Sequence, residues 1–114
     1  DYYNKNLYTK NILLPKTDKA NLSTNHLYIV NLKNKNDRKQ IFQKMRKKGF
    51  NLNIHYIPIH LHPYYLKKGF KRGNFPNSEW HYDTAISLPI YVDLRFNILR
   101  KIVKEFNHIL KSLK

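Results

Sequence analysis

The eleven residues from His55 to Tyr65 constrain the fold most, because the stretch combines ring side chains with prolines. It holds three histidines, three tyrosines and two prolines. Proline lacks the amide donor that an interior strand needs, so the chain is predicted to leave a strand here as a shaped loop. Two interpretations stay open: a rigid loop that presents binding residues, and a surface connection whose tyrosine rings cover the core.

The segment 50–56, which leads into this loop, alternates between apolar and polar residues. A period of two predicts a strand with one buried face and one polar face. The side chains predicted to be buried are those of Phe50, Leu52, Ile54 and Tyr56. The predicted polar row consists of Asn51, Asn53 and His55. Because that row runs directly into the loop, we expect the polar groups of strand and loop to open on the same place.

The other segments predict a small α+β domain. The predicted helices are the end of a helix at the start of the chain and the segments 37–48, 63–68, 78–85 and 99–113. The predicted extended segments are the second half of 1–15, then 26–32 and 87–89. Since helices and strands do not alternate regularly, we expect a short, largely antiparallel sheet covered by helices.

Local signals mark the ends of several helices. Asp37 and Gln40 match a capping box, in which the glutamine side chain answers the backbone N–H of the cap residue. Gly49 predicts a left-handed stop, and Ser78 or Asn77 is the predicted cap of the fourth helix. The last helix is the clearest element, because apolar residues recur at i, i+3, i+4 and i+7 over about four turns.

Length and composition fit one modest domain of 114 residues. No apolar run approaches the roughly 20 residues that a membrane span needs. There is no signal-peptide pattern and no cysteine, so a cytoplasmic protein is predicted. The only methionine is Met45 and the chain begins at Asp1, which favours a piece of a longer protein.

The net charge of +15, from 22 basic and 7 acidic residues, raises the question of an anionic partner. The alternative function considered is a basic single-stranded nucleic-acid-binding domain with interleaved tyrosines. It predicts an affinity that falls steeply with salt. The basic residues are spread along the whole chain, as codon choice in an AT-rich genome would also produce. The even spread argues against the nucleic-acid interpretation.

No self-contained active site is visible. A phosphate-binding loop and a nucleophile elbow are missing, and the lack of cysteine excludes thiol catalysis and the usual structural zinc sites. His55, His60 and His62 are metal-ligand types, but no Asp or Glu lies between Asp37 and Glu79. Neither a metal site nor a carboxylate acid–base pair near the loop is therefore predicted.

Three segments resemble one family in order and spacing. They are 26–32, the helix 37–48 with its ending Lys-Lys-Gly-Phe, and Asn-Ile-His-Tyr-Ile-Pro-Ile-His-Leu-His-Pro-Tyr-Tyr at 53–65. Together with Ser-Leu-Pro-Ile-Tyr at 87–91, they resemble the C-terminal domain of the DegT/StrS-type sugar aminotransferases. Within that family, residues 26–113 are most similar to the enzymes that aminate UDP-4-keto-6-deoxy-N-acetylaltrosamine on the way to pseudaminic acid.

The resemblance implies a small C-terminal domain of a homodimeric fold type I enzyme that depends on pyridoxal 5'-phosphate. Residues 1–25 would be the end of an interdomain helix, a short strand and a loop, and 26–114 the small-domain core. The large domain, which carries the Schiff-base lysine and most cofactor contacts, would be missing. The whole enzyme would transfer an amino group from glutamate to the keto sugar, and this chain alone is predicted to be inactive.

The resemblance also implies which residues face the substrate. The predicted substrate wall consists of Asn53, Ile54, His55, Tyr56 and His62. His60 and Tyr65 are predicted to brace the loop, while Trp80, Tyr82 and the apolar stripe of 99–113 are predicted to be core. Where the family has Thr or Ser as the cap of the last helix, this chain has Arg95, so either Asp93 is the cap or the helix starts without one.

Overall fold

A three-stranded antiparallel sheet forms the centre of the computed structural model, which describes residues 2–18 and 20–113. The strand order is β1-β2-β3, from Ile12–Leu13 (β1), Tyr28–Leu32 (β2) and Ala85–Leu88 (β3). The central strand β2 is β-branched and aromatic, and its burial alternates along the chain. β3 is buried at all four positions.

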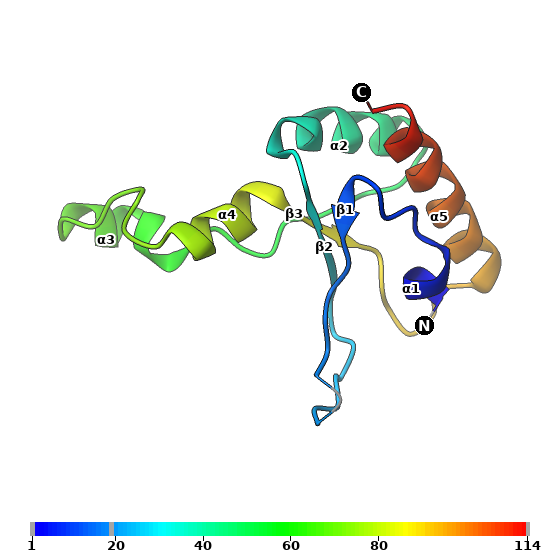
Figure 1. The fold of residues 1–114 in the computed structure, drawn as a ribbon, viewed down its shortest axis with the longest axis horizontal. Helices are drawn as coiled ribbons and strands as arrows, with labels where there is room; N and C mark the ends of the chain where they lie inside the picture. Colours follow the sequence, from blue (N-terminus) through cyan, green and yellow to red (C-terminus); the bar gives the residue numbers. More distant parts are fainter. Residues whose placement is uncertain (1, 19, 114) are drawn as a thin grey trace.

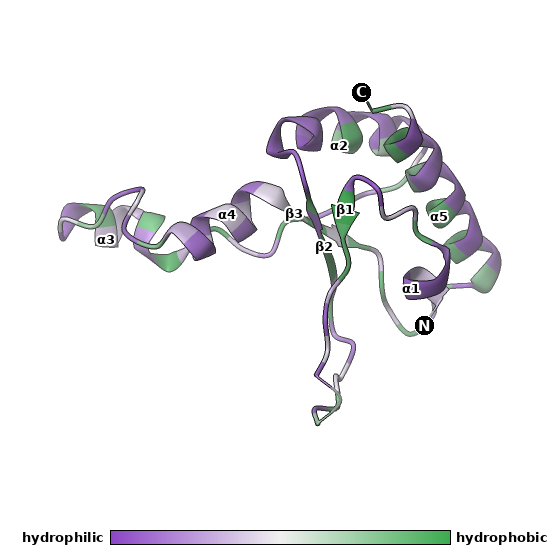
Figure 2. Cartoon of the chain, viewed as in Figure 1, coloured by the Kyte–Doolittle hydropathy of each residue, from purple (hydrophilic) through white to green (hydrophobic). Residues whose placement is uncertain are grey.

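Two helices supply most of the remaining core. In α2 (Arg38–Lys47) the buried side chains are Ile41 and Met45, and they pack towards α5 (Phe96–Lys111). The first helix, α1 (Tyr2–Asn6), lies against α5 and joins the same core through Tyr3 (Figure 1). Figure 2 shows hydrophilic and hydrophobic residues alternating along α2 and α5, as one-sided burial requires. Each fully buried aliphatic or aromatic side chain contributes about 1.5–3 kcal/mol to folding.

A second part of the chain extends away from this core. It consists of the short 3-10 turn Ile59–Leu61, α3 (Pro63–Lys67) and α4 (Pro76–Thr84), which lead out from the sheet and back to β3. We call residues 56–75 the arm; it forms the left side of Figure 1 and accounts for much of the 48 Å length of the molecule. The loop between β1 and β2 also projects from the sheet.

These features confirm the predicted α+β class, the antiparallel sheet and the helices at 38–47, 63–67 and 96–111. Gly49 has a φ of +81°, as its predicted role as a left-handed stop requires. None of the helices in the described part of the chain combines the length and the hydrophobicity needed to cross a bilayer.

The predicted strand 50–56 is wrong. Only Asn53 forms a bridge, to Ser87, and the flanking residues have no strand partner. Phe50, Leu52 and Ile54 are half-buried as the alternation requires, but Tyr56 is 68% exposed. The alternation predicted which side chains are half-buried, but such burial does not require a ladder, and backbone pairing is limited to the bridge of Asn53 with Ser87.

The predicted caps are also corrected. Asp37 has helical backbone angles as the last residue of the 3-10 turn Lys35–Asp37, so its carboxylate forms no cap bond. Instead Asn34 caps that turn, and Gln40 Nε2 donates to Asp37 Oδ1 at 3.3 Å.

Of the last two helices, α4 begins differently from the prediction. α4 starts at Pro76 rather than Ser78, because proline suits the first helical position. α5 starts after Arg95 without any side-chain cap, which is the second of the two predicted alternatives. Trp80, predicted as core, is 47% exposed on α4.

Candidate functional site

The root of the arm brings three polar side chains together. Ser87 on β3 and Asn53 form an antiparallel bridge, with Ser87 N–H donating to Asn53 O at 2.8 Å and Asn53 N–H donating to Ser87 O at 3.2 Å. Paired residues in such a bridge place their side chains on the same face. The residue two positions further along the extended chain places its side chain on that face as well. His55 therefore lies on the face that Asn53 and Ser87 share.

Hydrogen bonds connect these three side chains, which we call the root cluster (Asn53, His55 and Ser87). His55 Nδ1 lies 2.7 Å from Ser87 Oγ, and His55 Nε2 lies 3.3 Å from Asn53 Nδ2. Asn53 Oδ1 accepts from the backbone N–H of Ile54 at 2.8 Å. Ser87 is buried, His55 is half-buried and Asn53 is exposed, so the cluster runs from the core to the surface.

A second polar contact holds the arm to α4. The side chains of His60 and Glu79 are each only 7% exposed, and His60 Nε2 lies 2.8 Å from Glu79 Oε1. The same carboxylate accepts the backbone N–H groups of Gly73 at 2.8 Å and of Phe75 at 3.2 Å. Burial raises the pKa of Glu79, but the hydrogen bonds from Gly73, His60 and Phe75 outweigh it and hold that pKa below its ordinary value.

The other predicted site residues lie further along the arm. His62 is exposed, and its Nε2 contacts the backbone oxygen of Ile57 at 3.4 Å rather than the root cluster. Tyr56 is exposed, with its ring 4.5 Å from that of His55 in an edge-on arrangement. Tyr65 is 38% exposed and packs edge-on against Phe70. The structure thus joins Asn53 and His55 but leaves His62 apart from them.

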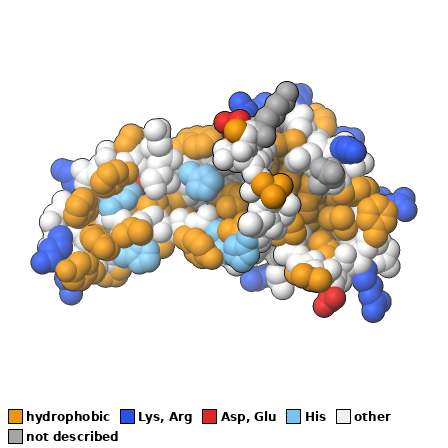
Figure 3. Space-filling view, turned by 90° about the horizontal axis from the view of Figure 1, so that it is seen from below, with side chains coloured by type: hydrophobic (Ala, Val, Ile, Leu, Met, Phe, Trp, Pro, Cys, Tyr) orange, Lys and Arg blue, Asp and Glu red, His pale blue; other side chains and the backbone are white. Residues whose placement is uncertain are grey.

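Apolar side chains cover the outside of the arm, with histidines between them, as Figure 3 shows. A hollow of about 360 Å³ lies among these side chains. It is lined by Ile59, His60, Tyr65, Phe70, Phe75 and Ser78. So many exposed rings in one segment are unusual for a surface that faces only water.

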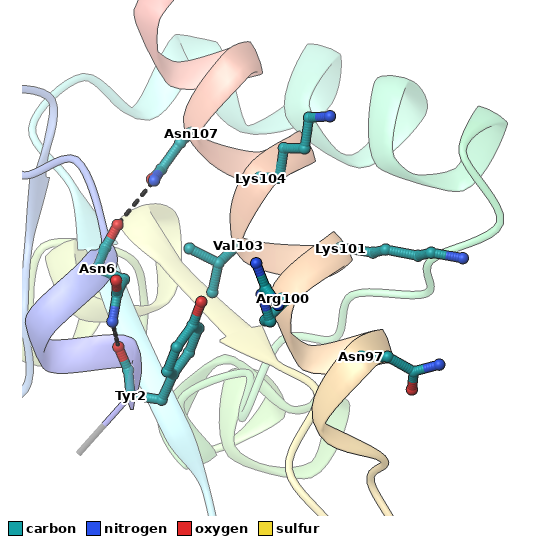
Figure 4. A pocket seen from close by; sticks show the side chains of 8 residues that line it. All are labelled: Tyr2, Asn6, Asn97, Arg100, Lys101, Val103, Lys104 and Asn107. Carbon is teal, nitrogen blue, oxygen red and sulfur yellow. Dashed lines mark hydrogen bonds between the residues drawn. The ribbon is translucent and has the colours of Figure 1, made fainter.

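A larger hollow of about 440 Å³ lies between α1 and α5 (Figure 4). The side-chain amides of Asn6 and Asn107 are already engaged: Asn107 Nδ2 donates to Asn6 O at 2.7 Å, and Asn107 Oδ1 accepts from Tyr8 N–H at 2.8 Å. Asn6 Nδ2 in turn donates to Tyr2 O at 2.8 Å. The hollow is therefore the seam that fixes α1 to α5, with the exposed cations Arg100, Lys101 and Lys104 around it.

A family model matches residues 1–107, which is most of the chain; it describes the DegT/DnrJ/EryC1/StrS aminotransferase family. The chain belongs to this family. It is 40% identical over 91 residues to an uncharacterized protein of Methanocaldococcus jannaschii, a match that covers 70% of this chain and 24% of the relative.

Solved aminotransferase structures of this family share the fold in their C-terminal region. A structure described as a sugar aminotransferase of Streptococcus pneumoniae, in its PLP form, is 26% identical with a TM-score of 0.86, covering 98% of this chain and 30% of that one. Helicobacter pylori PseC, an aminotransferase involved in pseudaminic acid biosynthesis, is 23% identical with a TM-score of 0.82 over 98% and 30%. The chain thus spans less than a third of the length of these relatives.

The described residues of this DegT-family chain do not fit a complete pyridoxal phosphate site. A Schiff-base lysine must be held in a shielded pocket, and every lysine in the described part is exposed. Lys19 and Lys114 lie outside the described residues. The three histidines of the loop contact separate partners, and residues 2–18 and 20–113 contain no cluster of three metal-ligand side chains.

Two residues that the sequence analysis missed belong to the site. No carboxylate is close to the loop in the sequence, but α4 returns along the arm and places Glu79 beside His60, 19 positions away. Ser87 was assigned only to an extended segment, and its bridge to Asn53 is a long-range contact. The nearest signal in the sequence was the polar row of Asn53 and His55, which needed a polar partner.

Proposed function

We propose that this chain is the substrate-facing C-terminal domain of a nucleotide-sugar aminotransferase. The observation that carries the proposal is the root cluster. An amide and an imidazole group, bonded to the buried hydroxyl group of Ser87, reach the surface where the exposed arm begins. In that role Asn53, Ile54, His55, Tyr56 and His62 would contact the sugar nucleotide through hydrogen bonds and ring faces. His60 and Tyr65 would hold the shape of the loop.

The cofactor belongs, in this proposal, to the part of the relatives that this chain does not cover. Pyridoxal phosphate carries the amino group from donor to acceptor, and the protein supplies binding and orientation. The share of this chain would be to orient the sugar and to exclude water from one side of it. The apolar rings of the arm would then pack against the large domain of a homodimeric enzyme in the cytoplasm.

We infer as the substrate a UDP-4-keto-6-deoxy amino sugar, with glutamate as the amino donor. The support is the motif order from Asn53 to Tyr65, which resembles the pseudaminic acid enzymes. The likeness to the Helicobacter pylori protein adds the fold alone, since 23% of residues are identical.

The test is an amino-transfer assay on the whole polypeptide that is translated from the gene containing this chain. The polypeptide is incubated with pyridoxal phosphate, glutamate and UDP-4-keto-6-deoxy-N-acetylaltrosamine, and the amino sugar is measured by mass spectrometry. Product formation that is lost in Asn53→Ala and retained in Lys104→Ala supports the proposal. Amination of a different keto sugar would support the proposed reaction but contradict the proposed substrate.

Binding of single-stranded DNA is the control for the alternative considered from composition. A fluorescent oligonucleotide is titrated into the 114-residue chain at two salt concentrations. Tight binding that weakens steeply with salt, together with no amino transfer, would favour a nucleic-acid partner and contradict our proposal.

A further inference from the structure

Ser87 occupies a buried position next to the imidazole ring of His55. Its side chain is on β3, its relative exposure is 4%, and its Oγ is 2.7 Å from His55 Nδ1. That contact is partly buried, whereas the contact of His55 Nε2 with Asn53 is exposed. Nδ1 of the imidazole therefore faces the protein, and Nε2 faces outwards.

The orientation of the Asn53 amide decides which ring nitrogen carries the proton. Asn53 Oδ1 is occupied by the backbone N–H of Ile54, which can only donate, so the Nδ2 group must be the one that points at His55. An amide NH₂ donates and cannot accept. His55 Nε2 must then be an acceptor without a proton, and in neutral imidazole the proton lies on Nδ1.

From these contacts we propose that Ser87 is a positioning residue that, with Asn53, holds neutral His55 in its Nδ1-protonated form. Nδ1–H donates to Ser87 Oγ, and the lone pair of Nε2 is presented at the surface of the arm root. This lone pair selects a ligand that donates a hydrogen bond, such as a sugar hydroxyl group. The ligand would replace Asn53 Nδ2 as the donor to His55 Nε2. A carbonyl or phosphate oxygen would find no free donor on neutral His55, because Nδ1–H is already bonded to Ser87 Oγ.

The tautomer of His55 stands on the contacts within this chain, whereas the sugar hydroxyl as ligand rests on the proposed function. The two can fail separately. If the amino-transfer assay fails but the tautomer is found, Ser87 still positions His55 for another ligand. If the tautomer is not found, the positioning role is overturned whatever the enzyme does.

The experiment is a long-range ¹H–¹⁵N correlation spectrum of the ¹⁵N-labelled 114-residue chain at about pH 8, where an ordinary histidine is neutral. Protonated and unprotonated ring nitrogens resonate in well-separated regions, and His55→Gln identifies the His55 signals. We expect the Nδ1-protonated form to exceed the other by roughly five- to tenfold, the preference that one net hydrogen bond gives. A ring protonated mainly on Nε2 would overturn the proposal.

Two variants separate positioning from mere folding. Ser87→Ala is expected to lose the preference for Nδ1–H, while Ser87→Thr keeps the hydroxyl and retains it. Asn53→Asp replaces the exposed donor by an acceptor and is expected to move the proton to Nε2. This change does not touch the core and remains informative if Ser87→Ala fails to fold. Ser112→Ala, at the C-terminal cap of α5, is the matched control. An unchanged His55 in both Ser87→Ala and Asn53→Asp would contradict the proposal.

Discussion

His60 Nε2 and Glu79 Oε1 lie 2.8 Å apart in a part of the arm where both side chains are almost completely buried. Glu79 also accepts two backbone N–H groups from the turn that joins the arm to α4. One carboxylate thus holds the loop before α3 and the turn after it against α4. The arm keeps its shape through this contact because its apolar rings are largely exposed and offer little burial.

Replacing Glu79 should loosen the arm more than the core. In Glu79→Ala the donors of His60, Gly73 and Phe75 lose their acceptor, and unsatisfied buried donors are costly. We expect faster hydrogen exchange at the amides of Gly73 and Phe75, with little change in β2. Glu79→Gln keeps one acceptor oxygen and should have a smaller effect. Glu105→Gln, which removes an exposed ion pair with Lys48, is the control; equal exchange in all three variants would contradict this role.

Acidification should weaken the same contact. The pKa of Glu79 is held below its ordinary value, so its stabilising contribution is present above the unfolded-state pKa and is lost as pH falls through the folded-state pKa. We therefore expect the exchange rates of the Gly73 and Phe75 amides, corrected for intrinsic chemistry, to rise below about pH 4. Glu79→Gln should remove most of this pH dependence, and an unchanged acid response in that variant would point to other carboxylates, such as Asp83.

Local sequence patterns predicted the helices and strands that have a regular apolar face. The apolar spacing of α5 and the β-branched run of β2 were sufficient, because both bury one regular face. The segment 50–56 was not predictable in the same way. Its side-chain alternation is real, but whether it forms a ladder depends on which edge β3 leaves open. In the structure that edge accepts Asn53 alone.

The residues of the candidate site also differ in whether a local pattern predicts them. Asn53 and His55 could be placed together because they are two residues apart on one chain segment. Ser87 and Glu79 reach the loop through contacts 32 and 19 positions away, which no local pattern encodes. The substrate wall as a whole stays a prediction, and the hydrogen bond of His62 is to its own loop.

Substituting Gly49 should have a cost that is purely conformational. Its φ is +81°, and a Cβ atom added there would meet no heavy atom within 4 Å. We expect Gly49→Ala to lower the free energy of unfolding by about 1 kcal/mol, because L-residues disfavour this region. Gly49→Asn should lose less, since asparagine tolerates the left-handed conformation. Urea denaturation of the two variants tests this, and a loss for Asn as large as for Ala would contradict it.

Phe106 should be the most sensitive position of the core. Its side chain is fully buried on α5 among residues from the sheet and the other helices. We expect Phe106→Ala to lower the free energy of unfolding by about 3–5 kcal/mol, through lost burial and a residual cavity. Lys104→Ala, two residues earlier on the exposed face of the same helix, should change it by less than about 0.5 kcal/mol. Similar losses in the two variants would mean that α5 is not packed as described.

Tyr3 should make stability depend on alkaline pH. Its hydroxyl group donates to Pro89 O at 2.7 Å, and its ring lies 4.7 Å from that of Tyr28. Burial, and then the neighbouring Tyr28 and Tyr91, raise the pKa of Tyr3 far above its ordinary value, and burial raises the pKa of Tyr28 to about 12. A raised pKa gives stability that is complete below the unfolded-state pKa and is lost as pH rises through the folded-state pKa.

We expect Tyr3→Phe to cost about 0.5–1.5 kcal/mol near neutral pH, the net value of the lost hydrogen bond. Above about pH 10 Tyr3 ionises in the unfolded wild-type chain but stays protonated in the folded one, and the variant has no such group. The difference in unfolding free energy between the two should therefore stay constant up to about pH 9 and shrink as the pH rises above about 10, as measured by urea denaturation. A difference that stays constant with pH would show that Tyr3 ionises as readily in the folded chain as in the unfolded one.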